Sequence, residues 1–545
     1  MDEIAEVKSF EARTALLNWK IPAATVILGA MALLPAVPFA SGAELKATPS
    51  TFQKLLSALK PGDTMNLEPG QYPPLAIAKL NGEPDAWITI KGPATGKPAA
   101  VVGEIGSNTI EIVNSSFLAI ENLRIDSRGI PGAFGISAKG GERNHTHDIR
   151  IEGNTLVGQN GNQQTDGIST KIPTWGWIIR NNQILGAGTG IYLGNSDGTD
   201  PFVSGLIEHN LVKDTIGYNM EIKDQFSIPA VPGMPLKSSS TIIRDNVFIK
   251  DDSPSPDGDR PNLLVGAFPE TGIGFLNLYE IYGNFFYHNH REALFQGSGR
   301  VSLHDNIFVD GPLNYSAVEL RRQNFPLKLA YVYNNTVYTQ GRGISFGTPA
   351  VTADAVTGNL VFASDPITGP IGRLSNNLAA PFASALGYVN LPSFELGSMD
   401  FYPRTGKCQG PTISLIPFHS DADYNLDFNG TPKNKAKGAP VFRGAYSGSG
   451  TNPGWQLQAA IKPPRAPSSE TAASGYSGTV LDQLGRVDSF ETADSTETKQ
   501  SSAAYGETGF TNHRAGDCCY RPADAYAAGV LLWQPTAGAQ FSATQ

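Results

Sequence analysis

One short stretch of the sequence carries an amide, a carboxylate and an amine on alternate residues. It reads N-M-E-I-K, so in an extended strand Asn219, Glu221 and Lys223 point to one side and the two apolar residues to the other. Two long loops flank this stretch, at 224–237 and 251–261. Because function concentrates on long loops carried by a rigid scaffold, these three polar side chains form the best candidate site in the chain.

A five-residue phrase of the same pattern recurs along the chain. Its second and fourth positions are mostly apolar, so the first, third and fifth positions are expected to point outward from a strand. In stacked strands, equivalent positions form columns with a spacing of about 4.8 Å. The copies span 135–139, 167–171, 190–194, 219–223, 262–266, 293–297, 317–321 and 343–347.

The fifth position of this phrase forms a column with four cations and no acid. On a chain of formal charge -9, such a row predicts a groove for an extended anionic polymer such as a uronic-acid polysaccharide. The alternative is an ordinary solvated face that prevents edge pairing. We place Tyr218, beside the central strand, with the substrate-binding residues. The fifth-position residues are Lys139, Lys171, Gly194, Lys223, Gly266, Gly297, Arg321 and Gly347, and the third-position residues are Ser137, Ser169, Tyr192, Glu221, Leu264, Phe295, Glu319 and Ser345.

A second phrase consists of an apolar residue, two variable residues, Asn and an apolar strand. Its shortest spacing, 22 residues from Asn284 to Asn306, is what three short strands and three turns require. Asn suits a sharp corner because it tolerates left-handed backbone angles and its amides can stack into a ladder. The chain is therefore predicted to be all-β, a right-handed parallel β-helix, with these Asn side chains in one line on its flank. They are Asn122, Asn154, Asn182, Asn210, Asn246, Asn284, Asn306, Asn335 and Asn359.

The chain divides into four predicted regions. Residues 1–43 form a hydrophobic leader, either a cleaved signal peptide or a retained segment, and 44–380 form the β-helix with an N-terminal cap. That cap is a short helix opened by a capping box from Ser50 to Gln53. Irregular strands and a C-terminal cap follow over 381–462. The remainder, 463–545, is a low-complexity tail predicted to be disordered.

The region from about 50 to 460 resembles the pectate-lyase superfamily of parallel β-helix proteins, and the Asn phrase makes that resemblance specific. Around Glu221 and Lys223 the sequence resembles the chondroitinase B and alginate lyase family. The resemblance implies that Lys223 is a catalytic base, that Arg260 is its acid partner, and that Asn219 and Glu221 hold calcium. It also implies β-elimination, in which a base removes the proton α to a uronate carboxylate whose charge is neutralised.

Other interpretations remain open for this face and its loops. Q-T-D-G at 164–167 indicates a polygalacturonase-type hydrolase, and a non-catalytic polysaccharide-binding or cell-surface protein would need no catalytic residue. Four Asp residues between 251 and 259 could hold calcium or form a solvated acidic turn. His288 and His290 are either turn residues or an acid–base pair.

Composition and charge limit the classes of partner that the chain can bind and indicate where it acts. The net charge of -9 argues against nucleic acid, because no basic excess is present to neutralise phosphates. Cys408, Cys518 and Cys519 have neither zinc-ligand spacing nor the arrangement of a disulfide framework. We expect a secreted or periplasmic monomer that acts on an acidic polysaccharide and has no stable membrane span once the leader is removed.

Overall fold

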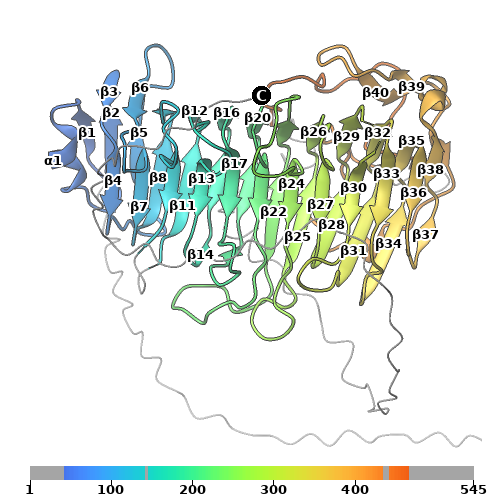
Figure 1. Cartoon of the computed structure of the whole chain (residues 1–545), viewed down its shortest axis with the longest axis horizontal. Coiled ribbons are helices and arrows are strands. Elements are labelled where there is room, and N and C mark those ends of the chain that lie inside the picture. The colour runs from blue at the N-terminus through green and yellow to red at the C-terminus, as the bar shows by residue number, and fades with distance from the viewer. Residues whose placement is uncertain (1–41, 141–144, 313, 434–440, 465–545) are drawn as a thin grey trace, which may run out of the picture. The chain divides into compact units, whose positions relative to one another are not determined.

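Three long parallel sheets build the protein (Figure 1). The computed structural model describes residues 42–140, 145–312, 314–433 and 441–464, all of which belong to the compact unit Met1–Phe490. Sheet A has 13 strands, sheet B has 12 and sheet C has 11, and each coil contributes one strand to A, B and C in turn. The predicted parallel β-helix is confirmed.

Sheet A contains β1 (Glu44–Ala47), β2 (Thr64–Leu67), β5 (Ile88–Lys91), β8 (Ser116–Glu121), β11 (His147–Glu152), β15 (Ile178–Arg180), β19 (Leu206–Glu208), β22 (Ser240–Arg244), β25 (Leu278–Tyr282), β28 (Arg300–His304), β31 (Leu329–Tyr333), β34 (Ala353–Thr357) and β37 (Leu374–Ser375). Sheet B contains β3 (Gly70–Tyr72), β6 (Ala99–Val102), β9 (Arg124–Asp126), β12 (Thr155–Val157), β16 (Gln183–Leu185), β20 (Leu211–Lys213), β23 (Val247–Ile249), β26 (Phe285–Tyr287), β29 (Ile307–Asp310), β32 (Thr336–Thr339), β35 (Leu360–Ala363) and β38 (Leu378–Pro381). Sheet C contains β4 (Leu75–Ala78), β7 (Ile110–Val113), β10 (Ile136–Ala138), β13 (Asp166–Thr170), β17 (Thr189–Leu193), β21 (Met220–Ile222), β24 (Leu263–Val265), β27 (Phe295–Gly297), β30 (Ser316–Leu320), β33 (Arg342–Phe346) and β36 (Asp365–Thr368).

The core is a continuous stack of apolar side chains between the sheets. Alternation along each strand sends one set of residues inward, so Ile136, Ile168, Ile191 and Met220 lie in register and are fully buried. Aromatic rings stack in the same way, with Phe286 4.6 Å from Phe308 between ring centroids. Each coil thus buries its apolar face against its neighbours, which is how a solenoid builds one core along its axis.

The Asn ladder forms at the corner between sheets A and B. The side-chain nitrogen of each member donates to the side-chain oxygen of the next, as from Asn154 to Asn182 at 3.1 Å. The same nitrogen also donates to a backbone carbonyl, so the amides are buried and hydrogen-bonded rather than exposed on the flank. The chain of bonds continues through Asn182, Asn210, Asn246, Asn284, Asn306, Asn335, Asn359 and Asn377.

Two details of the predicted ladder were wrong. Asn122 lies one position before the ladder, because the backbone nitrogen of Leu123 is the group that donates to the Asn154 side chain. At the other end, the ladder extends beyond Asn359 to Asn377. The left-handed backbone also falls on the residue before each ladder Asn, with φ of 56° at Asn181 and 54° at Asp245. The ladder positions therefore require Asn for its side-chain amide, and the left-handed backbone conformation of the corner is adopted by the preceding residue.

The N-terminal end is closed by a short helix, α1 (Phe52–Leu56), as Figure 1 shows. The helix begins at Phe52 with Thr51 as its N-cap, and no side chain caps it, so the predicted capping box from Ser50 to Gln53 was wrong. Phe52 is buried and meets the ring of Tyr72 edge-on at 5.5 Å. An unpredicted strand, β1, precedes the helix and starts sheet A.

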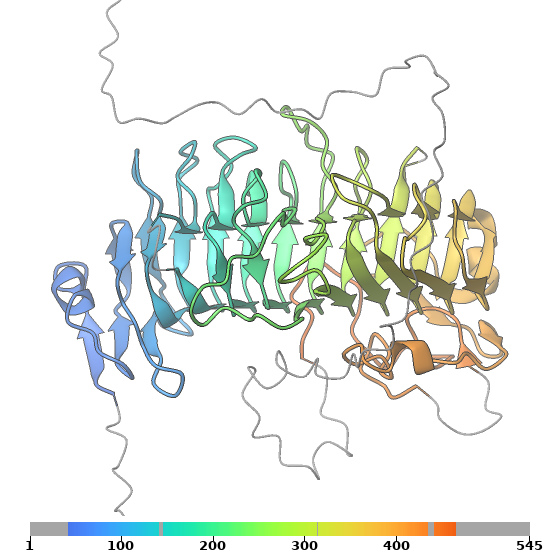
Figure 2. The same ribbon diagram turned by 90° about the horizontal axis from the view of Figure 1, so that it is seen from below.

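The segment after β38 runs back along the coils (Figure 2, orange). Lys462 contributes a backbone oxygen to His209 and an ammonium to Asp245 at 2.7 Å, so the segment reaches coils far from its own start. Asp421 accepts from the Ser302 hydroxyl nearby. The remaining elements are η1 (Phe382–Gly387), η2 (Ile416–Phe418), the antiparallel pairs β39 (Val389–Leu391) with β40 (Asp400–Pro403) and β41 (Gln409–Gly410) with β42 (Val441–Phe442), and the parallel pair β14 (Thr174–Trp175) with β18 (Phe202–Val203).

Some predicted features fall on residues that the structure does not describe. Nearly all of the leader and the tail, together with Cys518 and Cys519, lie outside the described residues. Among the described residues, no helix has the length and apolar character needed to cross a membrane.

Candidate functional site

The outward face of sheet C presents the two predicted columns, with one shift of register. Leu263 pairs with Phe295 and Leu264 with Gln296, so Phe295 points into the core and Gln296 points outward. Ser298, not Gly297, then occupies the fifth position of that coil, since its backbone nitrogen bonds to Val265. The other seven copies of the phrase keep the predicted register along β10, β13, β17, β21, β24, β30 and β33.

Two ion pairs meet around one tyrosine at the centre of this face. Lys223 Nζ lies 2.7 Å from Glu221 Oε1, and Lys171 Nζ lies 3.6 Å from Asp166 Oδ2. The Tyr192 ring, on the strand between them, has the Lys171 ammonium 4.8 Å from its centroid and the Lys223 ammonium 5.2 Å from it. Five ionisable side chains from three consecutive coils therefore converge here, and we call them the sheet C cluster.

The sheet C cluster is layered, with carboxylates below and cations above. The side chains of Asp166 and Glu221 are each 3% exposed, whereas those of Lys171 and Lys223 are 32% and 23% exposed. Gly194, with φ of 92°, follows the strand between the two lysines, and a Cβ there would lie 3.2 Å from the Lys223 Cβ. A molecule approaching this face therefore meets ammonium groups before it meets carboxylates.

Burial shifts the protonation of two members of the cluster. Loss of solvent raises the pKa of Asp166 to about 7, against the opposing effect of the Lys171 ammonium, and Asp166 Oδ2 has no hydrogen-bond partner. Burial also raises the pKa of the Tyr192 phenol, and the charges of Glu221 and Asp166 add to that rise. Asp166 can therefore exchange a proton near neutral pH, while Tyr192 stays protonated.

Small hydroxyl side chains lie next to the cluster on the preceding coils. Ser169, between Asp166 and Lys171, donates to the Ser137 hydroxyl at 3.0 Å, and both serines are buried. Their size lets the Lys171 side chain fold back toward Asp166 on its own strand. Both serines are fully buried, so they belong to the packing beneath the cluster and not to its outer surface.

The outer predicted cations lie on the same sheet, Lys139 on the coil next to that of Lys171 and Arg321 three coils beyond Lys223. Lys139 follows β10 and pairs with Glu111 at 3.5 Å, and Arg321 follows β30 and pairs with Glu319 at 3.5 Å. Their side chains are 49% and 44% exposed. All four cations of the predicted row thus follow strands of sheet C.

Arg260 and Tyr218 form a separate pair at the start of these strands. The Arg260 guanidinium lies 5.6 Å from the Tyr218 ring centroid and donates to the backbone oxygens of Asp257 and Asp259. Both residues precede their strands, whereas Lys223 follows β21. No contact in the described structure joins Arg260 to Lys223.

The predicted calcium ligands do not make a calcium cage. Asn219 is fully buried, its amide nitrogen donates to Ile249 and Thr215, and Glu221 is engaged by Lys223. Calcium takes six to eight oxygen ligands, about three times the number these two side chains supply. These two side chains alone do not make a calcium site; Asn219 Oδ1 is buried without a hydrogen-bond partner, and the role of both residues as calcium ligands stays a prediction.

Asp166 is the main member of the cluster that the sequence interpretation did not assign to the site. It was part of Q-T-D-G at 164–167, noted only as a hydrolase-like phrase. In the alternation of this strand Asp166 is in phase with the inward Ile168 and Thr170, so the pattern contains no signal for its place in the cluster.

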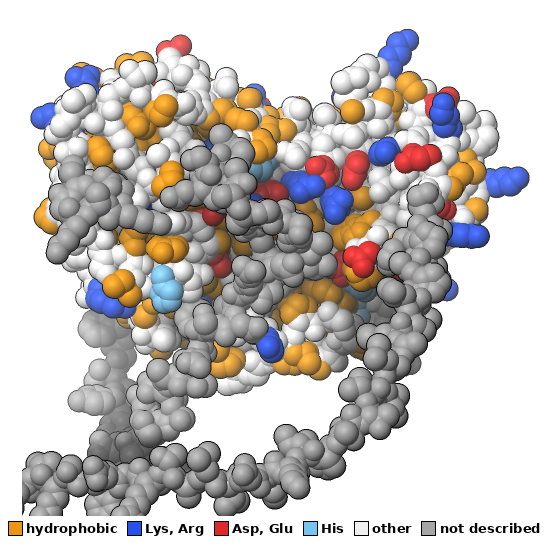
Figure 3. Space-filling view, turned by 180° about the vertical axis from the view of Figure 1, so that it is seen from behind, with side chains coloured by type: hydrophobic (Ala, Val, Ile, Leu, Met, Phe, Trp, Pro, Cys, Tyr) orange, Lys and Arg blue, Asp and Glu red, His pale blue; other side chains and the backbone are white. Residues whose placement is uncertain are grey.

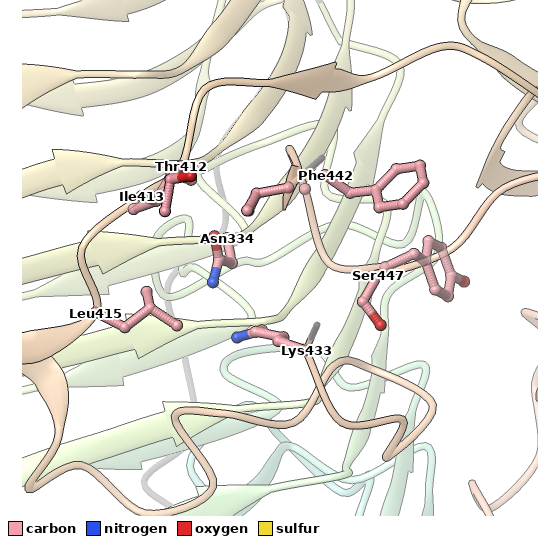
Figure 4. Close-up of a pocket in the computed structure, with 10 residues that line it drawn as sticks. Asn334, Thr412, Ile413, Leu415, Lys433, Phe442 and Ser447 are labelled. Atoms are coloured by element: carbon pink, nitrogen blue, oxygen red, sulfur yellow. The ribbon is translucent and has the colours of Figure 1, made fainter. Parts of the chain in front are cut away.

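A cavity elsewhere in the molecule contains none of these residues. It has a volume of about 80 Å³ and lies under the C-terminal segment, where Asn334, Ile413, Leu415 and Lys433 line it (Figure 4). Lys433 is occupied there by an ion pair with Asp305 at 2.6 Å. The cavity is part of the packing of that segment.

Sheet A carries a different column of charges. Figure 3 views the molecule from behind and shows a band of alternating acidic and basic side chains. Along sheet A, Glu152 pairs with Arg180 at 2.8 Å, and Glu208 pairs with Arg244 at 2.8 Å. Beyond Arg244 the column continues as the stacked rings of Tyr282, His304 and Tyr333.

Comparison with known proteins finds structures but no sequence family. No family model and no curated protein matches this chain. Pectate lyase Pel9A is 14% identical over 75% of this chain and 97% of its own, with a TM-score of 0.41. The PL6 alginate lyase AlyGC is 14% identical over 62% of this chain and 51% of its own, with a TM-score of 0.40, so the chain spans about half of it. An alginate lyase from Paenibacillus sp. str. FPU-7 is 17% identical over 62% and 99% of the two chains, with a TM-score of 0.34.

Proposed function

We propose that the outward face of sheet C binds an acidic, uronate-containing polysaccharide and cleaves it by β-elimination. The observation that carries this proposal is the layering of the sheet C cluster, in which Lys171 and Lys223 cover the buried carboxylates of Asp166 and Glu221. A polyanion lying across the coils meets a row of cations extended by Lys139 and Arg321.

Lys223 is the proposed base. Its ammonium is 2.7 Å from Glu221, close enough for the proton to pass to that carboxylate. When a bound polymer displaces water, the lower local dielectric favours the neutral forms of both partners. The neutral amine then removes the proton α to the uronate carboxylate, the C–O bond at the β carbon breaks, and the electron pair becomes the new C=C bond.

Two further members of the cluster complete the reaction. Lys171 remains charged and neutralises the uronate carboxylate, which stabilises the negative charge that develops when the proton leaves. Tyr192 donates a proton to the departing glycosidic oxygen, a role supported by its place between the two lysines, whose charges stabilise the phenolate that forms. The proton that Glu221 received then passes to this phenolate and restores both groups. Because Arg260 is held by its own loop beside Tyr218, we assign these two residues to binding a neighbouring sugar.

A second candidate function is hydrolysis of the same class of polymer. Its support is the pKa of Asp166 near 7, beside Glu221 on the same face. A buried carboxyl group that can donate a proton near neutral pH and a second carboxylate on the same face are the general acid and base that a glycosidase requires. In that reaction Asp166 would protonate the leaving oxygen and Glu221 would activate water.

One experiment separates these functions from plain binding. The purified protein is incubated with a panel of uronate polymers, and both ultraviolet absorbance and reducing ends are followed. A lyase raises both, because the new C=C bond is conjugated with the carboxylate, and a hydrolase raises reducing ends alone. Retention on immobilised polymer with neither signal would leave a binding protein. A polymeric substrate also makes a secreted or periplasmic location part of the proposal, to be checked by cell fractionation.

A further inference from the structure

The corner between sheets B and C holds a group of metal-ligand side chains that the proposed function does not use. Asp252 lies in the loop after β23, and His288 and His290 lie in the turn after β26, on the next coil. Asp252 Oδ1 is 2.8 Å from His288 Nε2 and 3.1 Å from His290 Nδ1. One ligand atom from each residue lies within 4.8 Å of the others.

The turn that carries the two histidines is built to hold them. Asn289, between them, is buried, and its side-chain oxygen accepts from the backbone nitrogens of Arg291 and Glu292. Its side-chain nitrogen donates to Asn262 and to the backbone oxygen of Arg260. The two imidazole rings consequently stack on one side of the turn, with an interplanar angle of 16° and centroids 6.0 Å apart.

A buried carboxylate supports His288 from behind. Asp310, at the end of β29, is 2% exposed, and its Oδ1 lies 3.5 Å from His288 Nδ1, so Nε2 is left to face Asp252. A carboxylate behind a histidine is the usual companion of a metal-binding imidazole, because it fixes the ring and its tautomer. His288 also adopts φ of 60°, an uncommon conformation that the surrounding bonds maintain.

We propose that Asp252, His288 and His290 bind a divalent transition-metal ion such as Zn²⁺, with Asp310 as a positioning residue. Two imidazoles and one carboxylate are the nitrogen and oxygen donors that Zn²⁺ accepts, whereas Ca²⁺ requires mostly oxygen. Three protein ligands leave one position of a tetrahedral site for water or a substrate oxygen. The ion joins the 251–261 loop to the next coil, at the corner where the strands of sheet C begin.

The test is calorimetric titration of Zn²⁺ into chelator-treated protein without an affinity tag. Wild type is expected to bind one ion at this site. Asp252→Asn and His290→Gln are each expected to weaken binding at least about tenfold, and Asp310→Asn about tenfold through the orientation of His288. Asp252 suits the test because its side chain is 79% exposed, so the substitution leaves the fold intact.

Two controls make the result decisive. Asp251→Asn changes the neighbouring exposed carboxylate, which caps Ser253 and is outside the group, and it should bind Zn²⁺ as wild type does. Co²⁺ should give a visible absorption band with wild type that Asp252→Asn loses. Wild type without a bound ion, or Asp252→Asn with unchanged affinity, would overturn the proposal.

Discussion

Sheets A and C both carry charged columns, but their charges are neutralised in different directions. On sheet A the signs alternate from Glu152 to Arg244, so Arg180 lies between Glu152 and Glu208. Arg244 closes the column against Asp423 of the C-terminal segment at 3.4 Å. On sheet C three of the four cations of the row pair with an acid of their own coil, as Lys223 does with Glu221, and Lys139 pairs with Glu111 of the preceding coil.

The difference shows how one fold can make a structural surface and a binding surface from the same residue types. In a column of alternating signs, each charge is neutralised by its neighbours along the solenoid axis, so the column has little net electrostatic field. When all the cations stand in one column and the acids lie beneath or beside them, the outer layer keeps one sign. Sheet A is therefore suited to holding coils and the C-terminal segment together, and sheet C to receiving an anionic ligand.

The largest expected effect is the loss of catalysis on sheet C. Lys223→Ala should lower the rate of polymer cleavage by roughly 10²–10⁴-fold, because a general base is removed. The melting temperature should also fall, because the Glu221 side chain, 3% exposed, loses its partner, so the rates are compared per folded molecule. Initial rates and thermal melts measure the two quantities. Lys213→Ala, on sheet B, is the matched control, and a fully active Lys223→Ala protein would refute the site.

For the column of sheet A we expect a loss of stability without a loss of activity. Arg244→Met removes the partner of Glu208, whose side chain is 8% exposed, and should cost about 3 kcal/mol in the free energy of unfolding. Activity per folded molecule should not change. Urea denaturation measures the loss, and a Glu208→Gln and Arg244→Met double variant should recover part of it. Normal stability with lost activity would show that the two faces are not separate.

The stability of wild type and of Asp166→Asn should depend differently on pH, because Asp166 is a buried acid of sheet C. The pKa of Asp166 is about 7 in the folded protein and about 3.9 when unfolded, so the folded state binds more protons between those values. Wild-type stability should fall as pH rises through that window, and Asp166→Asn should not share that loss. Its melting temperature should exceed that of wild type by about 2–4 °C at basic pH but not near pH 4.

A second buried acid provides the control for that measurement. Burial of Asp421, a residue of the C-terminal segment, against sheet A also raises its pKa to about 7. It titrates in both proteins, so its effect cancels in the difference. A difference between wild type and Asp166→Asn that stays constant with pH would mean that Asp166 does not titrate in this range.

The repeat of the coils could be predicted because ladder Asn and inward aliphatic residues mark every turn. The errors occurred where the local pattern is ambiguous. In A-L-F-Q-G, Leu294 and Phe295 are adjacent apolar residues and both are buried, so alternation alone cannot choose the register. Asn122 follows Ile120 by two residues, whereas Asn154 follows Ile151 by three, so Asn122 takes the place that Gly153 has in the next coil.

The candidate site was harder to predict than the fold. Some of its contacts join residues of different coils, and one depends on a long side chain that folds back along its own strand. Column positions placed Lys171, Tyr192 and Lys223 on one sheet. The approach of Lys171 to Asp166 depends on the direction in which a long side chain lies over Ser169. The spacing of residues in the sequence determines the position of each Cα on the sheet, but it does not determine the direction of a flexible side chain.

The smallest expected effect concerns the ends of the cation row. Lys139→Ala and Arg321→Ala together should raise KM for a uronate polymer by about two- to fivefold and leave kcat unchanged, because exposed charge pairs contribute little each. Arg321 pairs with Glu319 of its own coil and Lys139 with Glu111 of the preceding coil, so the substitutions touch neither the core nor the ion pairs of the sheet C cluster. The effect should shrink at high salt, where the attraction of exposed charges is screened. Arg124→Ala, equally exposed on sheet B and paired with Asp126, should leave KM unchanged. An equal rise in KM from Arg124→Ala would mean that the polymer senses the total charge of the protein and not the row on sheet C.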